Sequence, residues 1–110
     1  MRPWRTTGRP ATRSEARMGV TVRDVPERQR YEADADGELA GFAEYETTNG
    51  TVVFTHTEVD DRFEGQGVGS TLARQALDAA RHAGLSVVPR CPFIRSWIER
   101  HPEYEDLVAS

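Results

Sequence analysis

Residues 62–69 read Arg-Phe-Glu-Gly-Gln-Gly-Val-Gly, with glycine at three alternate positions, and they are the most informative stretch of the chain. It follows a β-branched, apolar run over residues 51–59 and precedes helical spacing over residues 68–83. Glycine lets the backbone approach a ligand closely, and a helix N-terminus offers unpaired N–H groups with positive dipole character. The alternate glycines between strand and helix therefore predict an anion site, for which phosphate is the usual ligand.

The residues before this turn predict an antiparallel meander. Asp36-Gly37 and Asn49-Gly50 are strong two-residue hairpin signals. They join alternating or β-branched segments that predict strands over residues 20–25, 28–35, 38–47 and 51–59. In the second strand the alternation places Tyr31, Ala33 and Ala35 on one face. In the third strand it places one set on one face and Phe42 on the other; that set is Leu39, Gly41, Ala43 and Tyr45.

The residues after the turn predict a crossover helix, a parallel strand and a short final helix. Helical spacing relates Val68, Leu72, Ala76, Leu77, Ala80 and Ala83, and Gly84 is a natural stop. Residues 85–88 form a short apolar strand, and Pro92 opens a helix over residues 93–100. The fold class is α+β: an antiparallel β-meander, a β-α-β crossover and a C-terminal helix, in one domain over residues 18–110.

Composition narrows the class of protein. The 110 residues are 37% hydrophobic and 29% charged, as in a soluble domain, and no apolar run reaches the ~20 residues of a membrane helix. All 14 basic residues are arginine, so no internal lysine is open to acetylation. The single cysteine excludes an intrachain disulfide and suits a reducing cytoplasm. We expect a cytoplasmic protein without a membrane partner.

The charge is unevenly distributed. Residues 1–17 carry five arginines against one glutamate, whereas residues 18–110 carry nine arginines against 17 acids. The acidic body argues against nucleic acid as a partner and is mildly consistent with a cationic acceptor. We expect residues 1–17 to be a disordered extension, or to precede a true start at Met18; the alternative is a basic arm that contacts RNA, a membrane or a partner.

The pattern Arg62-x-x-Gly65-x-Gly67 resembles the signature of the GNAT superfamily of acetyl-CoA-dependent N-acetyltransferases. With the stretches at 56–59, 91–92 and 101–104, the chain looks like the very small single-domain members over about residues 20–108. The resemblance implies acetyl-CoA as cosubstrate, a small-molecule or protein amine as acceptor, and a monomer or homodimer. Larger members carry two helices between the first two strands. Here only residues 24–27 separate them, so we expect an open acceptor side, or one completed by another chain.

Two other phosphate loops do not fit. A Walker A loop needs a lysine, and the chain has none. A dinucleotide fingerprint needs glycine or alanine where Ser70 stands. A turn that merely connects strand to helix stays open as an alternative. Metal is not expected, because the three histidines and one cysteine lack the usual close ligand spacing.

The resemblance assigns the cosubstrate contacts to two segments. Backbone amides would hold the diphosphate at Gly65, Gln66, Gly67, Val68, Gly69 and Ser70. Arg62 would flank them, unless it is a solvated surface charge. The backbone of Glu58, Val59 and Asp60 would bind the pantetheine arm where this strand diverges from its parallel partner, which ends near Pro89.

His56 and Glu58 are the candidates for proton transfer. They lie two apart on one strand, so both point to one face, which we expect them to share with Val52 and Phe54. An imidazole and a carboxylate can together take a proton from the incoming amine. The alternatives are a hydrogen-bonded core or edge histidine and a solvated glutamate.

Cys91 closes the last strand next to the expected divergence. It would line the acetyl site, carry the acetyl group or protonate the leaving thiolate, and its alternative is a small buried hydrophobe. Larger family members use a tyrosine after the last strand as that acid, but Tyr104 lies past the short helix and is expected to cap the core with Leu107. His101 is expected to end the helix.

The sequence therefore predicts an N-acetyltransferase that moves an acetyl group directly to a primary amine. The rival is a non-catalytic module that binds coenzyme A or acyl-CoA and acts through a partner protein. A third possibility is a fold that has lost its ligand.

Overall fold

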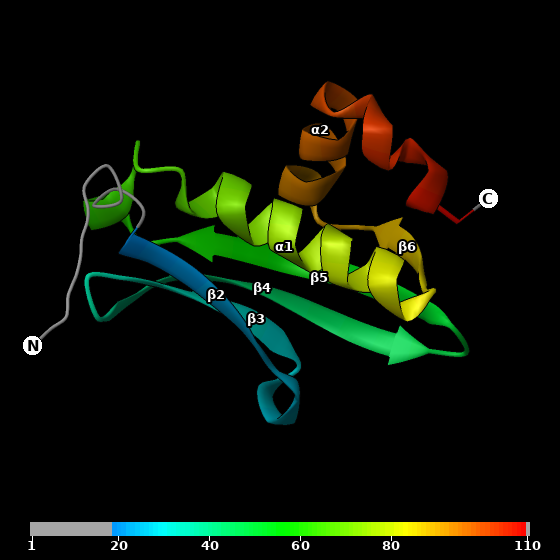
Figure 1. Ribbon diagram of the computed structural model, residues 1–110, viewed down its shortest axis with the longest axis horizontal. Coiled ribbons are helices and arrows are strands. Elements are labelled where there is room, and N and C mark those ends of the chain that lie inside the picture. Colours follow the sequence, from blue (N-terminus) through cyan, green and yellow to red (C-terminus); the bar gives the residue numbers. More distant parts are fainter. Residues whose placement is uncertain (1–18, 110) are drawn as a thin grey trace, which may run out of the picture.

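Residues 19–109 are described by a computed structural model (Figure 1); the extension predicted over residues 1–17 lies outside this range. One sheet contains all the described strands in the order of the chain. They are β2 (Val20–Val25), β3 (Arg30–Ala35), β4 (Glu38–Thr48), β5 (Thr51–Val59) and β6 (Ser86–Pro89). The first four pair antiparallel, and β6 pairs parallel with β5. The predicted meander and crossover are confirmed.

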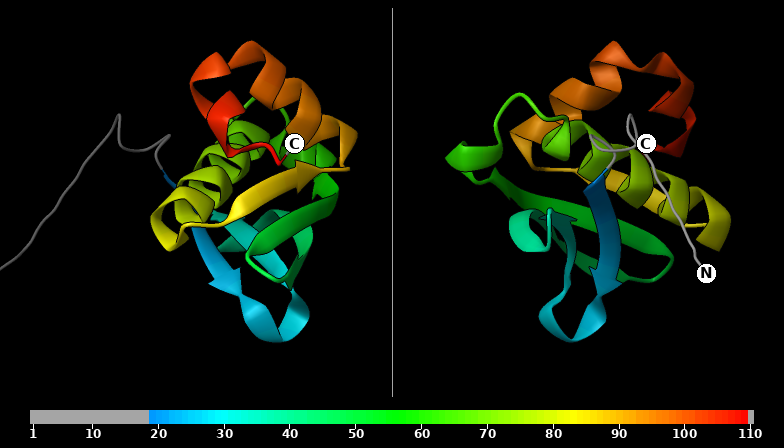
Figure 2. Two further views of the ribbon diagram at one scale, coloured as in Figure 1. Left: turned by 90° about the vertical axis from the view of Figure 1, so that its right-hand side faces the viewer. Right: turned by 60° about the vertical axis from the view of Figure 1, so that its left-hand side comes forward.

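The helices α1 (Val68–Ala83) and α2 (Pro92–Arg100) lie on the same face of the sheet, as Figures 1 and 2 show. A 3-10 helix over Pro102–Leu107, which the sequence did not predict, continues the chain along this face. No helix within residues 19–109 combines the length and the apolar character that a bilayer crossing requires.

The predicted turns and helix stop are present. Asp36, Gly37, Asn49 and Gly50 all have positive φ, as the favoured two-residue hairpin turns require. Gly84 is the left-handed C-cap of α1, and its N–H bonds back to the last turn of that helix.

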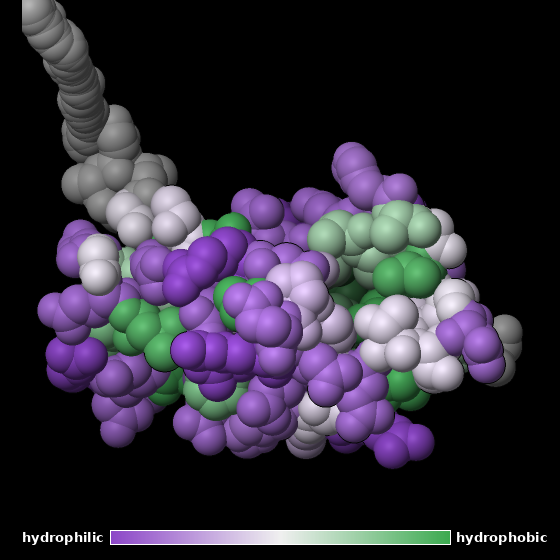
Figure 3. Space-filling model, turned by 90° about the horizontal axis from the view of Figure 1, so that it is seen from below, coloured by the Kyte–Doolittle hydropathy of each residue, from purple (hydrophilic) through white to green (hydrophobic). Residues whose placement is uncertain are grey.

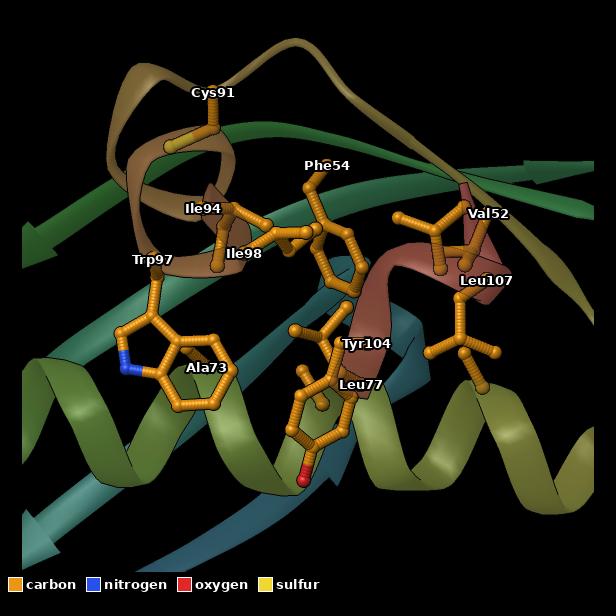
Figure 4. Close-up of a cluster of buried hydrophobic side chains, with 13 residues drawn as sticks. Val52, Phe54, Ala73, Leu77, Cys91, Ile94, Trp97, Ile98, Tyr104 and Leu107 are labelled. Atoms are coloured by element: carbon orange, nitrogen blue, oxygen red, sulfur yellow. The ribbon is translucent and has the colours of Figure 1, made fainter. Parts of the chain in front are cut away.

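The core fills the space between the sheet and the two helices (Figure 4). Ala33 and Ala35 are buried and Tyr31 packs against them, so the predicted face of β3 is confirmed. Helix α1 buries Val68, Leu72, Ala73, Ala76, Leu77 and Ala80. Ala83, also expected on this face, is exposed at the last turn.

A β-bulge changes the face of β4. The register passes from Ala33–Gly41 to Asp34–Leu39, so Ala40 is the extra residue. Ala40 is fully buried, whereas Leu39 is 42% exposed. The prediction that Leu39 shares a face with Gly41, Ala43 and Tyr45 was therefore wrong, because a bulge reverses the alternation of side chains.

A second bulge lies in β5. The register passes from Tyr45–Phe54 to Glu44–His56, which leaves Thr55 as the extra residue. Val52 and Phe54 point into the core beneath the helices. His56 and Glu58 point to the opposite face, so the prediction that all four share one face was wrong.

The other face of the sheet carries no helix among the described residues. Only a short 3-10 turn, Pro26–Arg28, joins β2 to β3. Figure 3 shows this face as mostly hydrophilic, with small apolar patches. An open side of the sheet, as the sequence predicted, is therefore present.

We expect Gly41→Ala to lower the free energy of unfolding by about 1–3 kcal/mol, because a Cβ there would lie 2.7 Å from the Glu58 carbonyl oxygen and the backbone cannot yield. Gly69→Ala is the matched control. Its Cβ would also meet an atom at 2.7 Å, but that atom is the movable ring tip of Phe93. We expect its effect to be below about 1 kcal/mol, since alanine favours helix. Equal losses in urea unfolding would contradict this account.

An ion-pair cluster covers part of the open face. The Glu32 side chain is 4% exposed and accepts hydrogen bonds from Arg23 at 2.8 Å, Arg28 at 3.2 Å and Arg30 at 2.7 Å. Arg23 also pairs with Asp34. Burial opposes ionisation of Glu32, but the hydrogen bond from Arg30 and the three arginine charges outweigh it and lower the pKa of this carboxyl.

Glu32→Gln is expected to lower the free energy of unfolding by about 1–3 kcal/mol at neutral pH. A carboxyl whose pKa is lowered by folding stabilises the protein above its unfolded pKa of about 4.3, and this stabilisation is lost as the pH falls through the folded pKa. The difference between variant and wild type should therefore shrink in acid. Glu44→Gln, on the same face, should show neither effect; a pH-independent difference for Glu32→Gln would contradict the assignment.

Candidate functional site

The glycine turn forms a set of backbone N–H donors at the start of α1. Gly65 and Gly67 both adopt the left-handed conformation, with φ of 84° and 79°. Gly67 is the N-cap of α1 and provides no side-chain cap. The backbone N–H groups of Val68, Gly69 and Ser70 have no acceptor among residues 19–109; the first helical bond runs from Thr71 N–H to the Gly67 carbonyl at 2.9 Å. These donors and the helix dipole suit an anion. We call this segment, residues 65–70, the cradle.

A cleft of about 310 Å³ opens in front of the cradle. Its far wall is α2, which contributes Phe93, Trp97 and Arg100, and its floor includes Val59 at the end of β5. The wall is held in place from α1, because the Trp97 indole N–H donates to Ser70 Oγ at 2.9 Å. Figure 4 shows the Trp97 ring reaching from α2 towards α1.

Two arginines lie near the cradle, and they differ in their ion pairs. Arg62 pairs with Asp60 at 3.2 Å and with Glu38 at 2.9 Å, which joins the 3-10 turn at Asp61–Phe63 to the hairpin before β4. Its hydrogen bond to Asp60 raises the pKa of Arg62 and lowers that of Asp60. Arg100 lines the cleft and has no ion pair among residues 19–109. The sequence reasoning did not single out Arg100.

A notch separates the end of β5 from β6. The last parallel pair is Phe54–Pro89, and the Cys91 N–H then bonds to the Phe54 carbonyl at 2.9 Å. The end of β5, residues 56–59, pairs only with β4 among the described strands. The predicted divergence of the two strands is confirmed at the predicted proline.

The pattern of hydrogen bonds between β4 and β5 determines which peptide groups of β5 face the notch. Asp60 N–H donates to the Ala40 carbonyl at 2.7 Å. Because hydrogen-bonded and non-hydrogen-bonded pairs alternate along an antiparallel ladder, Val59 and Thr57 turn their peptide groups away from β4. Of the three residues predicted for pantetheine, Val59 therefore offers free backbone groups, whereas the Glu58 and Asp60 amides face β4. Thr57, which was not among the residues predicted to bind pantetheine, also has free backbone groups.

His56 and Glu58 form a pair on the open face. His56 Nε2 lies 2.8 Å from Glu58 Oε2, and both side chains are at least half exposed. The ring of Phe42 lies beside the imidazole, with 6.1 Å between the ring centroids. The predicted sharing of a face by His56 and Glu58 is thus confirmed, and both side chains are accessible from the open face.

Cys91 lies on the other side of the sheet. It is the N-cap of α2, is 2% exposed, and its thiol donates to Thr57 Oγ1 at 3.2 Å. Because Thr57 and His56 are neighbours in a strand, their side chains point to opposite faces. Cys91 and His56 therefore do not form a Cys–His pair, although both border the notch.

The remaining candidates have structural roles. His101 is the C-cap of α2, as predicted; its Nδ1 lies 2.8 Å from the Trp97 carbonyl and its ring stacks on Trp97. Tyr104 is buried in the core with Leu107, and its hydroxyl donates to Asp78 of α1 at 2.8 Å. Burial and this bond to Asp78 raise the pKa of Tyr104. Residues 19–109 contain no cluster of three metal-ligating side chains.

Comparison with known proteins gives a consistent family. A family model described as GCN5-related N-acetyl-transferase matches residues 30–107. Streptothricin acetyltransferase of Streptomyces lavendulae is 36% identical over 73 residues, which cover 64% of this chain and 39% of that protein. Protein NATD1 of Xenopus tropicalis is 35% identical over 52 residues, which cover 47% of this chain and 48% of that protein. The chain thus spans less than half the length of these curated relatives.

Solved structures share the fold. The solution structure of a GCN5-like protein from Staphylococcus aureus aligns with a TM-score of 0.65 at 22% identity, covering 84% of this chain and 90% of that one. A ribosomal-protein-alanine N-acetyltransferase from Brucella melitensis biovar Abortus 2308 aligns with a TM-score of 0.53 at 23% identity, covering 74% of this chain and 62% of that one.

Proposed function

We propose, because the chain belongs to the GCN5-related N-acetyltransferase family, that it transfers an acetyl group from acetyl-CoA directly to a primary amine. The proposal rests on one observation: the N–H donors of the cradle lie next to the notch at the end of β5. The unpaired N–H groups of Val68, Gly69 and Ser70 belong to residues that line the same cleft as Val59, and Val59 borders the notch. The Gln66 N–H instead donates to the Phe63 carbonyl at 3.3 Å. Free backbone groups at the end of β5 thus lie between the cradle, where a diphosphate would bind, and the notch in the sheet.

The cradle and the notch would bind different parts of acetyl-CoA. The diphosphate would accept hydrogen bonds from the N–H groups at the start of α1, where the helix dipole also favours negative charge. The pantetheine amides would pair with the free peptide groups of Val59 and Thr57. The thioester would then lie at the notch, near the buried thiol of Cys91.

The two substrates would approach from opposite faces. Acetyl-CoA lies on the helix side, whereas the His56–Glu58 pair lies on the open side. The notch connects the two sides because β6 ends at Pro89. An amine on the open face would therefore meet the thioester without a covalent enzyme intermediate, which favours direct transfer in a ternary complex.

In the proposed reaction the amine nitrogen forms a C–N bond to the thioester carbonyl. His56 accepts the proton that the nitrogen loses, and Glu58, at 2.8 Å, stabilises the resulting imidazolium. A free N–H in the notch would stabilise the oxyanion. The C–S bond then breaks and coenzyme A leaves as its thiolate, which takes a proton from solvent while His56 returns its proton to solvent. The Cys91 thiol would line the site of the acetyl group.

The proposal is tested by two measurements on the whole chain. Isothermal titration with acetyl-CoA should give saturable binding, and thiol release should appear with at least one member of a primary-amine panel. The absence of lysine in this chain removes self-acetylation of lysine side chains as a background reaction. No binding at high micromolar acetyl-CoA would refute the proposal; tight binding without transfer to any amine would favour the non-catalytic binding module.

Arg100→Ala is expected to weaken acetyl-CoA binding about tenfold, because Arg100 faces the cleft and would lose a charge-assisted bond to phosphate. Arg62→Ala is the matched control. Since Asp60 and Glu38 already hold Arg62, we infer a positioning role and expect a change in affinity of less than about threefold. Titration calorimetry with both variants separates the two arginines, and the reverse order of effects would contradict this assignment.

A further inference from the structure

A second cavity lies at the other end of α1. Its volume is about 230 Å³, and it lies between the second half of α1 and the core face of the sheet. No residue lines both this cavity and the cleft at the cradle. Ala79, in its wall, lies 11 positions after Val68, which is roughly 17 Å along a helix at 1.5 Å per residue.

The floor of this cavity is aromatic. Three neighbouring strands each contribute one ring: Tyr31 from β3, Tyr45 from β4 and Phe54 from β5. The rings of Tyr31 and Tyr45 are tilted, with centroids 5.3 Å apart, and those of Tyr45 and Phe54 meet edge to face at 6.4 Å. Tyr31 and Tyr45 are both partly exposed, whereas Phe54 is only 1% exposed.

The wall of the cavity is made of small side chains. Four residues of α1 line it, and all are alanine: Ala76, Ala79, Ala80 and Ala83. Leu85 closes the end beyond the helix. Larger apolar residues at the helix positions would fill the space over the aromatic rings. The alanines leave it open.

The mouth carries one negative charge. The core face of β2 begins with Val20 and Val22, but the next position on that face is Asp24. Asp24 accepts a hydrogen bond from the Tyr45 hydroxyl at 2.5 Å. Among the residues that line the cavity, Asp24 is the single acid, and no arginine or histidine accompanies it. Burial, together with the charge of Asp24, raises the pKa of Tyr31 and of Tyr45, so both phenols stay neutral.

We propose that this cavity binds a small organic cation: an ammonium group with methyl or short alkyl substituents. Aromatic faces attract such cations through their quadrupole while accommodating the alkyl groups, and a single carboxylate at the mouth supplies the counter-charge. The volume admits a ligand about the size of choline and excludes a nucleotide. The inference does not depend on acetyl transfer, because the cavity and the cradle are separate.

The test compares choline with 3,3-dimethylbutan-1-ol, which has the same shape without the charge. Each is titrated into the ¹⁵N-labelled full chain, and amide shifts are followed by NMR. We expect choline to shift amides of residues 76–83, to leave those of residues 65–70 unchanged, and to bind at least about tenfold more tightly than the alcohol. Equal affinities would identify a plain apolar void, and no saturable shift with choline would also overturn the proposal.

Variants add a second criterion. Ala79→Leu, which fills the cavity, should abolish choline binding, and Asp24→Asn should weaken it at least about fivefold. Gln75→Leu is the matched control, because it makes the same increase in apolar size at an exposed α1 position that does not line the cavity. Its choline affinity should be unchanged. If all three variants keep wild-type affinity in well-dispersed spectra, the site is elsewhere.

Discussion

His56→Ala is expected to lower the turnover of an acceptor amine by about 10²–10⁴-fold, the usual contribution of a positioned general base. The imidazole is half exposed on the open face beside the notch, where the amine must lose its proton, and Glu58 lies 2.8 Å away. The affinity for acetyl-CoA should stay within about twofold, because His56 lies on the opposite face from the cradle and its loss would act only on the proton-transfer step. Steady-state thiol release measures the first value and calorimetry the second.

His82→Ala is the matched control for this substitution. His82 is also an exposed histidine, but it lies near the end of α1, where its Nδ1 lies 3.3 Å from the Asp78 carbonyl oxygen. Its turnover should equal that of wild type. The turnover of Glu58→Gln should lie between those of His56→Ala and His82→Ala, because glutamine keeps the shape of the side chain and removes its charge. Unchanged turnover in His56→Ala would remove this residue from the mechanism.

Gly67→Val is expected to abolish the rise in melting temperature that acetyl-CoA produces in the wild-type protein. A Cβ at Gly67 meets nothing within 4 Å, so the new side chain would enter the open cleft that the diphosphate would occupy. A β-branched residue at a φ of 79° also strains the backbone by about 1–3 kcal/mol. This strain would change the direction in which the following N–H groups point. Thermal denaturation with and without acetyl-CoA measures the effect.

Gly37→Val separates the loss of the site from the backbone strain. Gly37 has a φ of 81° and open space around its Cβ, like Gly67, but it lies in the hairpin between β3 and β4. This control should melt at a lower temperature and keep the full ligand-induced rise. If Gly67→Val keeps that rise as well, the cradle is only a connecting turn.

Much of the fold could be predicted because its signals are local. The turns at 36–37 and 49–50 need positive φ, and glycine after asparagine or aspartate provides it. The end of α1 at Gly84 and the end of β6 at Pro89 likewise depend on the residue at that position alone. The cradle belongs to the same group, since glycine spacing and a following amphipathic helix define it.

The two bulges could not be predicted, because an extra residue depends on how two strands pair. Nothing in the alternation around Ala40 or Thr55 marks either as the unpaired position. The second bulge matters for function. Without it, His56 would point into the core with Phe54; with it, the imidazole reaches the open face.

The spacing of residues along α2 could have indicated Arg100 from the sequence. Phe93, Trp97 and Arg100 are spaced as i, i+4 and i+7, so they share one face of α2. The direction of that face depends on the packing of Trp97 against Ser70 of α1, a contact between residues 27 positions apart. Only the assembled fold shows that this face looks into the cleft.

The proposed function requires that bare peptide N–H groups at the start of α1 bind the diphosphate of acetyl-CoA. This requirement can be tested by solving a structure of the full chain with acetyl-CoA. We expect diphosphate oxygens within hydrogen-bond distance of the amides of Val68, Gly69 and Ser70, and the thioester at the notch beside Cys91. Coenzyme A bound elsewhere, with those amides still free, would contradict it.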